Sequence, residues 1–108
     1  RGLLSGKYTR LHTFPDSDMR SWDERFQGPR FQHAVRLVSD LKRVGERLGV
    51  PTAAVAIGWA IAQPQITAAI VGAKRPSQVL ENAKAVEVCV RPNAVRVIDK
   101  IASIHGGF

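Results

Sequence analysis

No charged side chain occurs between Leu48 and Ala73, and this uncharged run limits the folds that the chain can adopt. The run favours a protein interior, because ionised side chains are almost never fully buried without a partner. The alternative is a membrane span, which needs about 20 apolar residues. The tripeptide Gln63-Pro64-Gln65 divides the run into pieces of about fourteen and about eight residues, each too short for a span. We therefore expect buried elements of a globular domain and no membrane segment.

The last part of this run is the segment Ile66–Val71, which is apolar without polar alternation. That pattern is typical of a parallel strand covered on both faces. Gly72 then ends the apolar segment. The sequence therefore predicts one parallel-type strand, at about 66–71.

A basic turn follows the predicted strand, with Lys74 and Arg75 directly before Pro76. Proline suits the first position of a helix, where the backbone amide groups lack intrahelical partners. Those free amides and the helix dipole favour an anion. Three polar side chains then recur at spacings that place them on one helical face, which either extends the anion site or is a solvated surface; they are Gln78, Glu81 and Asn82.

A second short motif opens the chain as Gly2-Leu3-Leu4-Ser5-Gly6-Lys7. Its glycines let the backbone come close to a bound group, and Lys7 supplies a charge suited to a phosphate. The motif lacks the longer glycine spacing and the Lys-Ser/Thr ending of a P-loop. By itself it favours a turn with a solvated lysine over a phosphate site.

Apolar periodicity predicts three further helices. The spacing of apolar residues indicates a helix over 31–48, a helix over 53–62 capped by Thr52, and a last helix that begins at Pro92. The formal charge of +7 permits binding to nucleic acid, but the basic residues are spread over several helices and no nucleic-acid motif is present. We therefore expect no nucleic-acid partner.

The two glycine-containing motifs, Gly2–Tyr8 and Gly72–Asn82, together closely resemble the aldo-keto reductases. The second is similar to the last strand, loop and helix of that family, and the first to the segment after the seventh barrel strand. The resemblance covers nearly all 108 residues. It implies an α/β fold in which this chain is the mostly helical C-terminal fragment of a (β/α)8 TIM barrel. A complete barrel needs about 250 residues, so we expect residues 1–108 to be an incomplete domain of a longer protein.

The resemblance also implies that the chain binds NADP(H). The first motif would approach the pyrophosphate, Gly72 and Ala73 would let the second loop pass close, and the basic pair would bind the 2′-phosphate. The polar helix face would bind the ribose and adenine. The implied cofactor-binding residues are Gly2, Leu3, Lys7, Arg20, Gly72, Ala73, Lys74, Arg75, Gln78, Glu81 and Asn82.

Residues 9–29 lack a sustained period and contain many Asp, Ser, Arg, Gly and Pro residues, which indicates a long surface loop. In the resembled family this loop can fold over the cofactor. Arg20 occupies the place of an arginine that touches the cofactor in some members. Trp22 either lines a substrate pocket or anchors the loop, and we favour anchoring.

As a function, the resemblance implies reduction of aldehydes or ketones by hydride transfer from NADPH in the full-length protein. The family's catalytic residues come from earlier strands, so we assign none here, and Tyr8 falls in the cofactor segment. The alternative is a cofactor-binding regulatory module similar to the potassium-channel β-subunits. We also expect no metal site, because the sequence offers His33 no partner with which to form a ligand cluster. The single cysteine, Cys89, fits a reducing compartment such as the cytoplasm.

Overall fold

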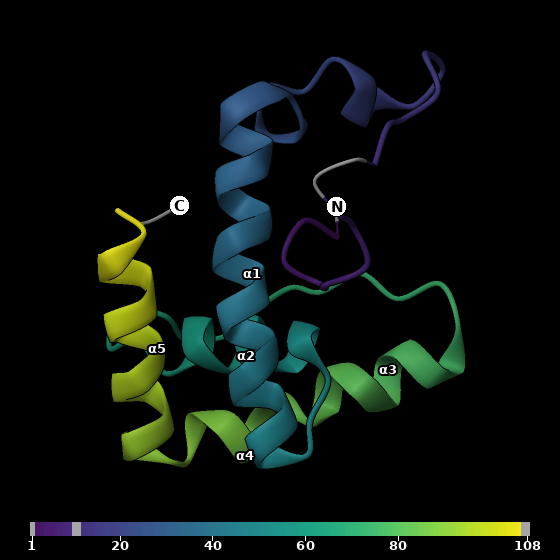
Figure 1. Ribbon diagram of the computed structural model, residues 1–108. Coiled ribbons are helices and arrows are strands. Elements are labelled where there is room, and N and C mark those ends of the chain that lie inside the picture. Colours follow the sequence, from purple (N-terminus) through teal and green to yellow (C-terminus); the bar gives the residue numbers. More distant parts are fainter. Residues whose placement is uncertain (1, 10–11, 107–108) are drawn as a thin grey trace.

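The computed structural model describes residues 2–9 and 12–106, and its regular structure is helical throughout (Figure 1). No helix in these ranges has the length and apolar character needed to cross a membrane. The helices in chain order are η1 (Met19–Ser21), η2 (Glu24–Phe26), α1 (Gly28–Leu48), α2 (Thr52–Ile61), α3 (Pro76–Ala83), α4 (Ala85–Cys89) and α5 (Pro92–Ile104).

The longest helix, α1, confirms the helix predicted over 31–48 and begins earlier, at Gly28. Its end follows from one glycine. Gly49 adopts a left-handed φ of 70°, and its backbone N–H bonds to the carbonyl of Gly45. Glycine tolerates this conformation because it has no Cβ, which makes it a common residue just past a helix end.

The main core lies where α2 packs against α1 and α4, with α5 closing one side. Gly58 of α2 permits this packing, since a Cβ there would lie 2.5 Å from the Val88 Cβ and 2.7 Å from the Ala85 carbonyl oxygen. Small residues allow helices to approach this closely. The buried core residues are Leu41, Val44, Val50, Ala54, Val55, Ala85, Val88 and Ile98.

The predicted strand at about 66–71 is wrong, because the described residues contain no strand. The segment instead forms an irregular, exposed connection between α2 and α3. Ile70 is fully exposed, and Ile66 and Val71 are each 45% exposed. A strand takes its hydrogen bonds from a neighbouring strand, and the described ranges supply none. The α/β expectation is therefore wrong for the described residues, whose regular structure consists of helices alone.

The predicted cap of α2 also needs correction. Thr52 does not cap α2, because it is the first helical residue and Pro51 occupies the N-cap position without a side-chain hydrogen bond. The helix after the basic turn is divided at Lys84 into α3 and α4. The predicted start of the last helix at Pro92 is confirmed by α5.

Helix α5 is fixed to the rest of the structure by two long-range polar contacts in addition to the burial of Ile98. Trp59 Nε1 donates to Asp99 at 2.6 Å. His105, at the end of α5, lies 2.7 Å from an Asp40 carboxylate oxygen on α1. These contacts tie the C-terminal helix to both α1 and α2.

We predict that Gly58→Ala destabilises the protein by about 1 to 3 kcal/mol, the usual cost of overpacking a core. Helix propensity alone would instead favour alanine by about 1 kcal/mol. Urea denaturation of both proteins measures the difference. Gly72→Ala is the matched control, because a Cβ at Gly72 meets nothing within 4 Å. A Gly58→Ala variant as stable as the parent would contradict the tight contact between α2 and α4.

Candidate functional site

The N-terminal motif forms a compact turn whose shape requires glycine. Gly2 and Gly6 have φ values of 80° and 83°, which side chains rarely adopt. Both the backbone N–H and the hydroxyl of Ser5 donate to the Gly2 carbonyl, at 3.2 and 2.6 Å. A Cβ on Gly2 would lie 2.9 Å from Lys7 Cε. The lysine therefore folds back over the turn, with its ammonium 5.3 Å from the centre of the Tyr8 ring.

Behind this turn lies a second, smaller core of aromatic rings. Tyr8 is only 9% exposed and contacts the rings of Phe14, Phe26 and Phe31. Leu3 packs against the same cluster. The turn is thus anchored to the start of α1, and the ring of Tyr8 is held inside the protein.

Arg20 is engaged by its own loop. Its Nε donates to Asp18 at 2.9 Å, a second Asp18 oxygen accepts from Nη2, and Nη1 bonds to the Tyr8 hydroxyl. The guanidinium also lies 4.9 Å from the centre of the Phe14 ring. The guanidinium of Arg20, which was expected to contact the cofactor, therefore forms its ion pair with the carboxylate of Asp18.

The Arg20 hydrogen bonds are the main reason that the pKa of Asp18 falls from its ordinary value of 3.8 to about 2. The positive charge of Lys74 contributes a smaller part of the shift. The basic turn that precedes α3 therefore lies within electrostatic range of the loop that carries Asp18.

This arrangement was not predicted, although a pattern in the sequence marks it. Asp18 and Arg20, like Asp23 and Arg25, are an aspartate and an arginine two residues apart. Each aspartate caps a short 3₁₀ helix and bonds to its arginine. Trp22 is 69% exposed, so the expectation that it anchors the loop is wrong. Instead, Gln27 holds the end of the loop in place, because its side-chain amide donates to the backbone carbonyls of Arg20 and Ser21.

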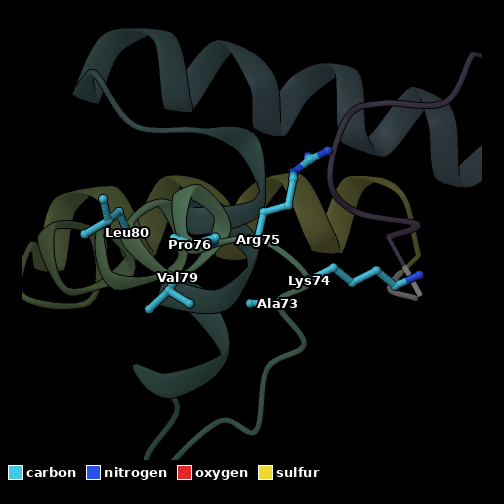
Figure 2. A pocket seen from close by; sticks show the side chains of 6 residues that line it. All are labelled: Ala73, Lys74, Arg75, Pro76, Val79 and Leu80. Carbon is cyan, nitrogen blue, oxygen red and sulfur yellow. The ribbon is translucent and has the colours of Figure 1, made fainter.

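The basic turn keeps both of its positive side chains exposed. Lys74 and Arg75 form no ion pair with the acidic residues of the described ranges. Figure 2 shows both side chains extending away from Val79 and Leu80 and toward the N-terminal segment drawn in purple. The ribbon in Figure 1 places the same purple turn beside the connection that leads to α3. The two motifs therefore lie on the same side of the protein.

The polar face of α3 contacts the basic turn. Gln78 Oε1 accepts the backbone N–H groups of Lys74 and Arg75, at 2.6 and 3.2 Å. Asn82 Nδ2 donates to the Gly72 carbonyl at 3.2 Å. Glu81 is exposed and forms no side-chain hydrogen bond or ion pair within the described ranges. The backbone N–H groups of Lys74 and Arg75, which precede α3, are therefore not free for an anion.

A groove lies beside the turn, lined by Ala73, Lys74, Arg75, Pro76, Val79 and Leu80. Its apolar residues and its two cations are of the kinds that contact the base and the phosphate of a nucleotide. In this groove the charged side chains of Lys74 and Arg75 are exposed, whereas their backbone N–H groups already have an acceptor. A Cβ added at Gly72 would meet no atom within 4 Å, so no neighbouring side chain or backbone requires a glycine there.

No other chemical centre is present in the described ranges. No three His, Cys, Asp or Glu side chains gather there in a way that could hold a metal ion. His33 lies against the His105 ring at 5.5 Å, and His105 pairs with Asp40. The Cys89 thiol lies 3.4 Å from the Val86 carbonyl oxygen in its own helix. His33, Asp40 and His105 thus join α1 to the end of α5, and the Cys89 thiol bonds within α4.

Known proteins match the chain over most of its length. A model of the aldo/keto reductase family matches residues 1–103. An aldo-keto reductase of Bacillus subtilis is 38% identical over 72% of the chain and 24% of its own length. A probable voltage-gated potassium channel subunit beta of Arabidopsis thaliana is 34% identical over 95% of the chain and 32% of its own length.

A solved structure also resembles the chain. The glycerol dehydrogenase of Gluconobacter oxydans superimposes with a TM-score of 0.74 at 30% identity, over 96% of the chain and 32% of that protein. The chain therefore spans about a quarter to a third of the length of the relatives it matches.

We predict that the Asp18 carboxyl titrates near pH 2 and that Arg20→Gln returns its midpoint toward 3.8. Because the folded pKa is depressed, the ion pair stabilises the loop fully above pH 3.8 and loses this effect as the pH falls toward 2. A carbon-13 NMR titration of the carboxyl group measures the midpoint. Arg25→Gln, which removes the Asp23–Arg25 ion pair and leaves Arg20 in place, is the control and should leave Asp18 unchanged. A midpoint of 3.8 in the parent protein would contradict the ion pair.

Proposed function

The chain belongs to the aldo/keto reductase family, and we propose that it forms the NADP(H)-binding, C-terminal portion of a longer oxidoreductase that reduces aldehydes or ketones. The observation that carries the proposal is the placement of two exposed cations, Lys74 and Arg75, on the side of the protein that also holds the glycine-bracketed turn at 2–7. A dinucleotide phosphate needs both features, because close backbone approach and positive charge are what favour its binding.

In the proposed complex the two turns bind different parts of the dinucleotide. Gly2, Leu3 and Lys7 lie at the pyrophosphate, where Lys7 is already folded over the turn. Lys74 and Arg75 bind the 2′-phosphate with their side chains, and Gly72 and Ala73 continue the same loop. The ribose and adenine lie along α3, near Gln78, Glu81 and Asn82.

To bind the cofactor in the proposed complex, Arg20 has to give up some of its hydrogen bonds to Asp18 or Tyr8. Its guanidinium is shared between Asp18 and Tyr8, so a ligand phosphate competes with a carboxylate for it. Charge-assisted bonds to a carboxylate and to a phosphate are of similar strength. Arg20 therefore has a secondary part in the proposal, and the exposed pair carries most of the anion binding.

The cofactor supplies the hydride, and the protein supplies position and electrostatics. This chain offers no catalytic residue in the proposal, so the isolated chain is inactive. Tyr8 is buried among aromatic rings and bonded to Arg20, which makes it unsuited to donate a proton to a substrate. The substrate of the complete protein is a small carbonyl compound, and its location in the proposal is the cytoplasm.

A second candidate function is supported by the similarity to channel β-subunits. In that case the protein binds the same cofactor and regulates another protein, with turnover absent or secondary. In either function the residues of the two turns bind the cofactor in the same way. Only a measurement of catalytic activity in the intact protein distinguishes the enzyme from the regulatory subunit.

We predict that Arg75→Ala weakens the binding of NADPH much more than that of NADH. The charge-assisted hydrogen bond that it removes is worth about 1.5 to 3 kcal/mol, or roughly 10- to 150-fold in affinity. Fluorescence quenching of the intact protein measures both affinities. Arg47→Ala, an exposed arginine on α1, is the matched control and should change neither. Equal losses for the two dinucleotides would refute the assignment of Arg75 to the 2′-phosphate.

We also expect the intact protein to oxidise NADPH when an aldehyde or a ketone is supplied, because the family relationship favours the enzyme. Loss of NADPH absorbance over a panel of carbonyl compounds measures this activity. NADPH binding without turnover of any panel member would favour the regulatory function. Absence of binding by the parent protein would refute both functions.

A further inference from the structure

Two side chains of α3 hold the basic turn in its conformation. The side-chain oxygen of Gln78 accepts the consecutive amides of Lys74 and Arg75, at 2.6 and 3.2 Å. One helical turn later, the side-chain amide of Asn82 donates to the carbonyl of Gly72, at 3.2 Å. Both side chains are half-buried. The turn is therefore fastened to α3 at both of its ends.

This arrangement determines which groups of the turn can bind an anion. With Gln78 as their acceptor, the amides of Lys74 and Arg75 point back toward α3. Their side chains extend the other way, toward the N-terminal segment (Figure 2). The turn therefore exposes two charged side chains, while the two backbone N–H groups are already bonded to Gln78. Phosphate loops that bind through the backbone have the opposite arrangement.

We infer that Gln78 is a positioning residue whose bonds to the turn set the preference for NADPH over NADH, by directing the side chains of Lys74 and Arg75 at the 2′-phosphate. The inference rests on the proposed function above and changes the part that Gln78 plays in it. Asn82 supports the same conformation through Gly72. Neither residue needs to touch the adenine for this effect.

The two dinucleotides distinguish this role from direct contact with the base. NADPH and NADH share the adenine and differ at the 2′-phosphate alone. Loss of a contact to adenine weakens both dinucleotides by the same factor. Loss of the turn's conformation weakens only the dinucleotide that carries the phosphate.

The first test is Gln78→Met in the intact protein, a change that keeps the side-chain length and removes the acceptor. We expect the affinity for NADPH to fall about 10-fold and that for NADH to change by less than about 2-fold. Gln32→Met, the same change at an exposed position of α1, is the control and should alter neither affinity. Equal losses for the two dinucleotides, or no loss at all, would overturn the inference.

The second test needs no ligand. Hydrogen exchange at the amides of Lys74 and Arg75 should be faster in Gln78→Met by several-fold, while exchange within α1 is unchanged and reports an intact fold. Gln78→Glu should restore the slow exchange, because a carboxylate also accepts both amides. Unchanged exchange in Gln78→Met would overturn the inference.

The two tests separate the inference from the proposed function. If the parent protein binds neither dinucleotide, the proposed function fails and the selectivity assigned to Gln78 fails with it. The exchange experiment would then still report whether Gln78 holds the turn. If the parent prefers NADPH and Gln78→Met retains that preference, the inference alone fails.

Discussion

The close approach of α2 to α4 at Gly58 is the tightest helix contact of the main core. It leaves no room for a side chain at Gly58, and the contact is made by the buried residues Ala85 and Val88 of α4. Helix α3 leads into α4 and also contacts α2, and the side chains of Gln78 and Asn82 hold the basic turn on α3. Helix packing in the core and these hydrogen bonds together place the two exposed cations.

The cationic side chains near the two turns differ in whether a carboxylate balances their charge. Arg20 has its charge balanced by Asp18, and the low pKa of that carboxyl keeps the pair ionised over the whole neutral and mildly acidic range. Lys74 and Arg75 have no such partner within the described ranges. Exposed cations without carboxylate partners cost little in water and remain able to bind an anionic ligand. This difference makes the basic turn the stronger candidate for phosphate recognition.

Much of this organisation follows from the sequence, and the failures have physical causes. Glycine and proline marked the end of α1 and the starts of α3 and α5, because their backbone preferences act locally. The prediction of a strand at about 66–71 was wrong because the hydrogen bonds of a strand depend on neighbouring strands, which no local sequence pattern describes. The roles of Gln78 and Asp18 were missed for a related reason. An amide or carboxylate side chain has several acceptable partners, and only the folded chain selects one.

We propose that the turn at 2–7 and the basic turn at 72–75 bind one dinucleotide between them. An experimental structure of the intact protein with NADP⁺ bound tests this proposal. We expect the pyrophosphate against Gly2 and Lys7 and the 2′-phosphate within hydrogen-bonding distance of the Lys74 or Arg75 side chain. A dinucleotide that binds away from either turn, or a 2′-phosphate held by other residues, would contradict it.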